Sequence, residues 1–375
     1  MQGIVRAFRH IDWVLLGALI PIFGFGLMTM NSFVDSNTFF DKQLIWVGVS
    51  LGVMVGISFI DFRFLRRTRV VMMLFLLAVV LLGLTYVLGE TVNGSQRWIN
   101  LGFFNFQPSD VVKLILIIVL AKYFSRRHIE IADSKHIIIS GLYAFSLFAL
   151  IFFQPDLGSA LILFAIWLGM VLVAGISKKH LGIIFMLGAI VFAVLWTSVL
   201  APYQKARIVS FLNPLEDIQG AGYNAYQSTV AVGSGGWFGK GVGYGTQSRL
   251  QFLPEYETDF IFAAFAEEWG FMGVLLLLIL YGIIFWRMTK SAMYGATNFE
   301  TLFCAGLSVF FLCHLTVHIG MNVGLLPVTG TTLPFMSYGG SHLLTESVGL
   351  GILFGMRRYA RPAHRSSFKN EIIGI

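Results

Sequence analysis

Residues 70–88 read VVMMLFLLAVVLLGLTYVL, an apolar run without a single charged side chain. At a rise of about 1.5 Å per residue, such a run forms a helix long enough to cross the roughly 30 Å hydrocarbon core of a bilayer. The whole chain has 375 residues, of which 57% are hydrophobic and only 12% are charged, unlike the composition of a soluble domain. The sequence therefore predicts an all-α, polytopic integral membrane protein.

Similar runs recur along the chain and predict about ten transmembrane helices. They lie near residues 12–32, 43–61, 70–88, 108–125, 137–153, 157–176, 181–201, 259–286, 301–321 and 342–356. The segments between them are too short to bury a core of their own, so residues 1–375 are interpreted as a single transmembrane domain. Three connections are long and rich in polar residues or glycine: 89–107, 202–258 and 322–341.

The distribution of Lys and Arg predicts the orientation. Nineteen of the 26 Lys and Arg fall on the N-terminal side of the membrane. Six fall on the other side: Lys42, Arg97, Lys205, Arg207, Lys240 and Arg249. By the positive-inside rule, both termini are cytoplasmic and the three long loops face outward. This asymmetry and attraction to anionic lipids account for the net charge of +7, so no nucleic-acid partner is expected.

The longest outer loop runs into FLPEYETDF, residues 252–260, where the carboxylate of Asp259 stands at the very start of the eighth span. A partly desolvated Asp has a raised pKa and can act as a general base on a sugar hydroxyl. Alternatively, Asp259 or Thr258 caps the N-terminus of the next helix, where the helix dipole favours negative charge. Both interpretations fit the spacing.

Other charged residues lie at the starts of spans or within them. Asp110 and Lys113 share one helix face at the start of the fourth span, where they can neutralise each other. A site that uses Lys113 to hold a phosphate would have the same sequence, so both interpretations stay open. Asp156 is interpreted chiefly as the N-cap of the sixth span. Glu267 and Glu268 lie inside the eighth span, and at least one should face a polar interior.

Two further patterns suggest ligands but fail on inspection. His314 and His318 have the i, i+4 spacing of a metal site, yet no third ligand is evident nearby. Hydrogen bonding between helices is the expectation for both. The glycine-rich run 233–241 is similar to a phosphate loop, but it has Gly241 where Ser or Thr should hold magnesium.

Several motifs, in this order, resemble the SEDS family of bacterial envelope proteins (shape, elongation, division and sporulation) over nearly the whole chain. They are Gly94–Ile99, Gln107–Asp110, Gln154–Gly158, Phe211–Pro214, Gly233–Gly243, Phe252–Phe262 and Gly324–Ser341. The pattern Tyr226–Ser228 with Gly245–Ser248 resembles the rod-shape, elongation branch more than the division branch. The family usually has Glu where this chain has Asp110, which shortens the reach of that carboxylate by one methylene.

The resemblance implies a peptidoglycan glycosyltransferase of the bacterial cytoplasmic (inner) membrane whose active site faces outward. Its substrate is lipid II, the undecaprenyl-pyrophosphoryl disaccharide-pentapeptide, which it polymerises into β-1,4 glycan strands during cell elongation. Asp259 takes the role of general base on the acceptor's 4-hydroxyl in one inverting displacement. The alternatives are a lipid II flippase, whose charges should lie near the midplane with access from both sides, a scaffold, and a division-specific relative.

The resemblance also implies substrate contacts and partners. The candidate substrate-binding residues are Lys113, Asp110, Asp156, Trp98, Lys42, Arg207 and Ser341. A departing pyrophosphate needs outer cations, and Lys113 is the first candidate among them. A divalent cation such as Mg²⁺ could add to these charges; the sequence indicates no definite cofactor and no metal ligand. Trp98 would stack on a sugar or anchor at the headgroups.

The expected partners follow from the same resemblance. They are a class B penicillin-binding protein with transpeptidase activity, the other proteins of the rod complex, and the lipids of the membrane.

Overall fold

The structure, a computed structural model, describes residues 10–33, 38–92, 95–102, 104–126, 134–198, 200, 202–212, 222–250, 252–253 and 255–359. Both chain termini and the motif residues Gly94, Asn213, Pro214 and Pro254 lie outside these ranges.

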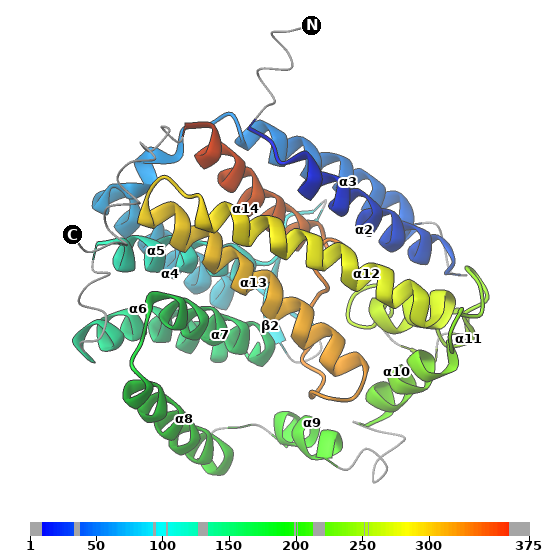
Figure 1. Ribbon diagram of the computed structural model, residues 1–375. Helices are drawn as coiled ribbons and strands as arrows, with labels where there is room; N and C mark the ends of the chain where they lie inside the picture. Colours follow the sequence, from blue (N-terminus) through cyan, green and yellow to red (C-terminus); the bar gives the residue numbers. More distant parts are fainter. Residues whose placement is uncertain are drawn as a thin grey trace, which may run out of the picture.

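Ten long helices run through the described part of the chain and occupy the positions of the ten predicted spans (Figure 1). They are α2 (Trp13–Asn31), α3 (Thr38–Ile57), α4 (Thr68–Leu88), α5 (Pro108–Ser125), α6 (Ser134–Phe152), α7 (Leu157–Ala174), α8 (Lys178–Ser198), α12 (Ile261–Met293), α13 (Asn298–Asn322) and α14 (Gly340–Tyr359). Eight of them are long and apolar enough to cross a membrane; the other two are α5 and α14. The all-α prediction is confirmed.

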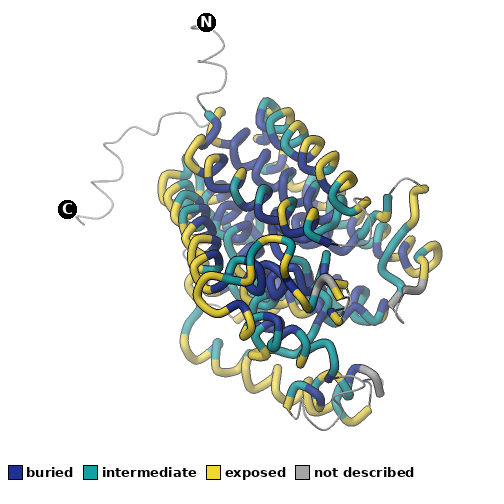
Figure 2. Tube along the Cα trace, turned by 90° about the vertical axis from the view of Figure 1, so that its right-hand side faces the viewer, coloured by how far each residue is buried: buried dark blue, intermediate teal, exposed yellow. Residues whose placement is uncertain are grey.

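The two exceptions are central helices. α5 packs against α4, α6, α7, α13 and α14, while α14 packs against α3, α5 and α13. Most side chains of both helices are buried, and Figure 2 shows buried residues concentrated inside the bundle, with exposed ones around it. α8 is the opposite case, because none of its residues is buried and it lies at the edge of the bundle in Figure 1. Helices enclosed by protein can therefore carry polar residues that lipid-facing helices cannot.

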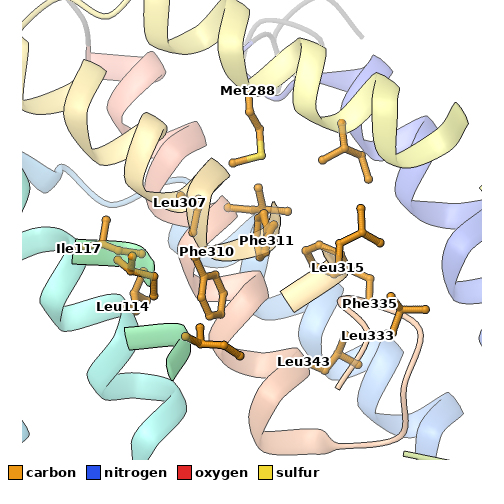
Figure 3. Packing of buried hydrophobic residues seen from close by; sticks show 14 of the residues in the cluster. Leu114, Ile117, Met288, Leu307, Phe310, Phe311, Leu315, Leu333, Phe335 and Leu343 are labelled. Atoms are coloured by element: carbon orange, nitrogen blue, oxygen red, sulfur yellow. The ribbon is translucent and has the colours of Figure 1, made fainter. Parts of the chain in front are cut away.

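The part of the hydrophobic core shown in Figure 3 lies where α5, α13 and α14 meet. Leu114 of α5 and Leu307 and Phe310 of α13 belong to one buried cluster with Leu343 of α14. Phe335, in the loop before α14, joins this cluster and stands edge-on to Phe311, with ring centroids 5.1 Å apart. The core thus holds the outer loop 322–341 against the bundle.

The connections predicted to be cytoplasmic gather at one end of the bundle. Asp12, just before α2, binds Arg287 of α12 and Arg357 of α14, with an oxygen–nitrogen distance of 2.8 Å in each pair. Arg66, in the short helix η1 (Phe62–Arg66), pairs with Glu300 of α13. The structure therefore confirms that these segments share one end, and the side of the membrane on which this end lies stays a prediction.

The outer loops contain short elements that the hydropathy pattern does not predict. Loop 89–107 holds an antiparallel sheet of β1 (Glu90–Val92), β2 (Ser95–Asn100) and β3 (Asn105–Phe106). Loop 202–258 holds α9 (Pro202–Leu212), α10 (Tyr223–Ser234) and α11 (Thr246–Arg249). Both loops therefore have a folded shape that can position side chains.

The glycine-rich part of the long outer loop packs directly against the backbone of α12. Gly270 interrupts that helix with φ +65°. The loop supplies hydrogen bonds there: Lys240 N donates to Glu267 O at 3.0 Å, and Phe271 N donates to Gly236 O at 2.9 Å. Gly239 has φ +78°, and a Cβ at this position would overlap the carbonyl of Glu268. The glycines are thus needed for close backbone approach.

Gly239→Ala should lower the free energy of unfolding by about 1–3 kcal/mol, because the added methyl group must displace the backbone of α12. Thermal unfolding of the detergent-solubilised protein measures this effect. Gly282→Ala is the matched control, since a Cβ at Gly282 meets no atom within 4 Å. Equal melting temperatures for the two variants would contradict the close docking of this loop.

Candidate active site

Asp259 lies at the end of the bundle that is predicted to face outward, called the outer end below, and it does not cap the next helix. The N-cap of α12 is Phe260, and no side chain forms a capping hydrogen bond there. The alternative that Asp259 or Thr258 caps this helix is therefore wrong. The reason is local backbone geometry: Phe260, with φ −119° and ψ +19°, takes the capping position one residue later. The Asp259 carboxylate is left for other contacts.

The backbone of Asp259 is held from two sides. Its N–H donates to Glu255 O at 3.0 Å, and its carbonyl accepts a hydrogen bond from Asn322 Nδ2 at 3.0 Å. Asn322, the last residue of α13, also accepts from Ala263 N at 3.2 Å and from Ser228 Oγ at 3.2 Å. This buried amide joins α10, α12 and α13, and sequence reasoning missed it. The available signal was a single Asn at the end of an apolar span.

The Asp259 carboxylate and the guanidinium group of Arg97 border the same small space. A Cβ placed on Gly330, whose φ is +69°, would lie 3.3 Å from Asp259 Oδ2 and 3.6 Å from Arg97 Nη1. Three outer segments meet at this point: β2, the start of α12 and the loop before α14. A side chain on residue 330 would fill the space between the Asp259 carboxylate and the Arg97 guanidinium group.

Burial raises the pKa of Asp259 from the usual 3.8 to about 7, against the opposing attraction of Arg97. Glu255 raises this pKa further by charge repulsion, and Arg207 lowers it. Burial likewise raises the pKa of Glu257. A carboxyl group with a pKa near neutrality can both accept and release a proton at physiological pH, which is the requirement for general base catalysis.

Asp156 connects Arg97 to the start of α7. Its carboxylate accepts a hydrogen bond from Ser159 N at 3.1 Å, so the N-cap interpretation is confirmed. The same oxygen, Oδ1, lies 3.9 Å from Arg97 Nη1, and Gln107 Nε2 donates to Oδ2 at 3.5 Å. Arg97 is therefore only loosely engaged, and its Nε has no hydrogen-bond acceptor among the described residues. Its guanidinium group also lies 5.9 Å from the ring of Trp98.

Asp110 and Lys113 form the ion pair that their spacing predicts. Lys113 Nζ lies 3.0 Å from Asp110 Oδ1, and both residues are buried. The pair extends to α14, where His342 Nδ1 lies 3.3 Å from Asp110 Oδ1 and His342 Nε2 lies 2.9 Å from Glu346 Oε1. His314 Nε2 lies 3.4 Å from Lys113 Nζ. We call these five residues the buried charge cluster; sequence reasoning found the pair but missed its continuation on α14.

The two histidines of α13 behave as expected for hydrogen-bonding residues. His314 Nδ1 lies 3.2 Å from Thr332 O, and His318 Nδ1 lies 2.7 Å from Thr331 O. His314 also reaches Lys113 on a different helix. Among the described residues, no three His, Cys, Asp or Glu side chains are close enough together to hold a metal ion.

The remaining predicted substrate contacts differ in position. Ser341 is buried at the start of α14, and its Oγ accepts a hydrogen bond from Gln107 N at 3.1 Å, so it fastens α14 to α5. Arg207 is exposed on α9 and lines a cavity of about 60 Å³ with Tyr226 of α10 and the segment 326–328. Lys42 is exposed on α3, and none of its described contacts brings it to Asp259.

Glu267 and Glu268 both face the folded outer loop. Glu267 lies 2.7 Å from Lys240 Nζ and accepts hydrogen bonds from Thr246 N and Gln247 N. Glu268 accepts one from Gly243 N at 3.0 Å. Both carboxylates are buried, so the expectation that at least one avoids lipid is confirmed for the pair.

Fold and site together define an integral membrane protein in which a carboxylate with a raised pKa lies beside an arginine at one end of the helix bundle. The family model of the FtsW/RodA/SpoVE cell cycle proteins matches residues 7–362. The chain belongs to this family, whose members are the SEDS proteins.

Its curated relatives come from different branches of the family. Stage V sporulation protein E of Bacillus subtilis is 37% identical over 332 residues, which are 88% of this chain and 89% of the relative. The peptidoglycan glycosyltransferase MrdB of Escherichia coli K12 is 36% identical over 78% of this chain and 79% of its own. A probable peptidoglycan glycosyltransferase FtsW of Thiomicrospira cyclica is 37% identical over 74% and 72%, respectively.

Solved structures have the same fold. A chain of a peptidoglycan synthase complex, described for its coordination of polymerization and crosslinking, superposes with a TM-score of 0.81 at 29% identity, over 94% of this chain and 99% of that one. The rod shape determining protein RodA of Thermus thermophilus superposes with a TM-score of 0.71, also at 29% identity, over 94% and 98%.

The pKa of Asp259 predicts the pH dependence of activity. A base works only when deprotonated, so activity should fall as the pH drops through about 7. Glu255→Gln removes a charge that raises this pKa, so the acid limb should move to lower pH. A pH–rate profile measures the shift, and Asp61→Asn, at the opposite end of the bundle, is the control. A limb that stays in place in Glu255→Gln would show that another group titrates.

A double-mutant cycle separates the two interpretations of Lys113. Lys113→Met leaves Asp110 buried without its partner and should cost about 3–5 kcal/mol of stability. Adding Asp110→Asn should restore part of this loss, as measured by thermal unfolding. If Lys113→Met instead keeps full stability but weakens use of a pyrophosphate-linked substrate, the phosphate-holding interpretation is favoured over simple pairing.

Proposed function

We propose that this protein is a peptidoglycan glycosyltransferase that polymerises lipid II into β-1,4 glycan strands at the outer face of the bacterial cytoplasmic membrane. The observation that carries the proposal is the Asp259 carboxylate, with a pKa of about 7, at the outer end of the bundle beside Arg97. The names of the family members MrdB and FtsW, and of the synthase complex, support the same class of reaction.

In this mechanism Asp259 accepts the proton of the acceptor's 4-hydroxyl. The oxygen attacks the anomeric carbon of the lipid-linked donor, a new C–O bond forms, and the bond from that carbon to the pyrophosphate oxygen breaks. The electron pair leaves with the lipid pyrophosphate, so negative charge develops there. Arg97 is the cation best placed to stabilise this charge, because its guanidinium group borders Asp259 and lacks a close ion pair.

The structure changes the ranking of the candidate cations. Lys113 is already neutralised by Asp110 inside the bundle, with His314 on its other side. Arg207, exposed on α9 and close enough to Asp259 to lower its pKa, is the second candidate after Arg97. In this proposal Lys113 and Asp110 position the elements around the site, and Arg97 and Arg207 meet the phosphates.

A flippase remains the second candidate because of the buried charge cluster. Asp110 Oδ2 is buried and has no hydrogen-bond partner among the described residues, as expected of a polar group that awaits a ligand or water. A transporter, however, would need its essential charges to open to both sides, whereas Asp259, Arg97 and Asp156 all belong to the outer end. A polymerase assay separates the two functions.

We also propose a role in cell elongation with a class B penicillin-binding protein as partner. The pattern Tyr226–Ser228 with Gly245–Ser248 supports the elongation branch, and the synthase complex supports a crosslinking partner. Identities of 36–37% to sporulation, division and rod-shape relatives leave this choice to experiment. Restoring rod shape to cells depleted of their elongation enzyme, but not division to cells depleted of the septal one, would support it.

Asp259→Asn should reduce polymerisation of purified lipid II by about 10²–10⁴-fold, the usual contribution of a general base. The assay uses the full chain in detergent with its transpeptidase partner, and glycan length is read on a gel. Glu255→Gln, four residues away on the same loop, is the matched control and should retain activity. If both variants make long glycan, Asp259 is not the base, and the flippase and scaffold alternatives come forward.

A further inference from the structure

A cavity with two cations in its wall lies at the basic end of the bundle, opposite to Asp259. It has a volume of about 210 Å³ and lies between the start of α4, the end of α5 and α6. Lys122 and Arg126, one helical turn apart at the end of α5, provide its polar side. Val71, Phe75 and Val119 provide an apolar wall that continues along α4 and α5 into the bundle.

The cations of this cavity differ from the ion-paired arginines at the same end. Four arginines at this end are neutralised, because Asp12 binds Arg287 and Arg357, Glu300 binds Arg66 and Asp61 binds Arg63. Neither Lys122 nor Arg126 forms an ion pair within the described ranges. Among the described residues, these two positive charges therefore have no carboxylate partner, and a ligand can supply the counter-charge.

Two further cations and a helix end increase the positive potential. Arg67 and Arg69 are exposed on either side of Thr68, which lines the cavity at the first turn of α4. The N-cap position of α4 is Arg67, and no side chain caps the helix there. The free N–H groups of that first turn add partial positive charge beside Lys122 and Arg126.

The walls of the cavity are held in place by aromatic contacts. Tyr143 of α6 stands edge-on to Phe75 of α4, with ring centroids 5.2 Å apart, and 6.2 Å from the ring of Tyr123 on α5. Tyr123 Oη lies 3.1 Å from His136 Nδ1. The site is thus preformed, and it opens toward the surface of α4, where Met72 and Leu76 are 51% and 63% exposed. That surface faces lipid in a membrane-spanning helix.

We propose that this cavity binds an anionic glycerophospholipid of the cytoplasmic leaflet. The headgroup phosphate lies between Lys122 and Arg126, and an acyl chain follows the wall of Val71, Phe75 and Val119. Basic pockets between transmembrane helices at the cytoplasmic side have the chemistry that anionic headgroups require. The apolar wall and its opening to lipid favour a phospholipid over free phosphate, and the positive-inside rule places this end in the cytoplasm.

The experiment compares retention of phosphatidylglycerol and phosphatidylcholine by the full-length protein, measured by native mass spectrometry from mixed detergent–lipid micelles. The wild type should retain phosphatidylglycerol preferentially. Lys122→Gln with Arg126→Gln should weaken this retention by about tenfold or more. The matched control is Lys178→Gln with Lys179→Gln, which removes two exposed cations of the same end at the start of α8.

Three outcomes would overturn the proposal. In the first, the wild type retains the two lipids equally. In the second, both double variants lose the same amount of bound phosphatidylglycerol. In the third, inorganic phosphate protects the wild type against unfolding as strongly as phosphatidylglycerol does. Met72→Trp guards against a folding defect, because it narrows the cavity from an exposed position and keeps every charge. It should also weaken retention of phosphatidylglycerol, and normal retention would count against the site.

Discussion

The buried charge cluster of Lys113, Asp110, His342, Glu346 and His314 is the constraint on which the rest of the bundle depends. An ionisable side chain that faces lipid near the bilayer centre costs about 2.5–3.5 kcal/mol on insertion scales. The helices that carry these residues must therefore be enclosed by others. α5 and α14 are enclosed in this way, and they are the two long helices that fall outside the eight most apolar candidate spans.

Enclosing α5 and α14 also builds the outer end. Both helices begin there, and the bond from Gln107 N to Ser341 Oγ joins their first turns. The segments next to these turns bring Gly330 and Arg97 to Asp259. Gln43 of α3 holds the loop before α14, because its Nε2 donates a hydrogen bond to Ser337 O at 3.0 Å. A site made of loops thus gains the rigidity of the helices below it. That rigidity matters because a general base must stay within reach of the proton that it removes.

Sequence reasoning succeeds where the physical signal is local. Apolar runs of span length, the i, i+3 pair of Asp110 and Lys113, and Asp156 before a helix are all visible within a few residues. The neighbours of these groups come from far along the chain, as when His342 of α14 approaches Asp110 of α5. Such contacts depend on how helices pack. Asp259 does not cap α12 because of the φ and ψ angles of Phe260, and these angles cannot be read from the type of residue at that position.

α5 shows two different ways to accommodate charge in one membrane helix. Near its outer end, Lys113 is enclosed by other helices, so protein carboxylates and imidazoles must neutralise it. At its inner end, Lys122 and Arg126 lie where the side chains can reach the membrane interface, so lipid phosphates can do the same. Enclosure by protein therefore decides whether the counter-charge comes from the chain or from the bilayer. Only the neutralisation of Lys122 and Arg126 at the inner end therefore depends on the lipid composition of the membrane.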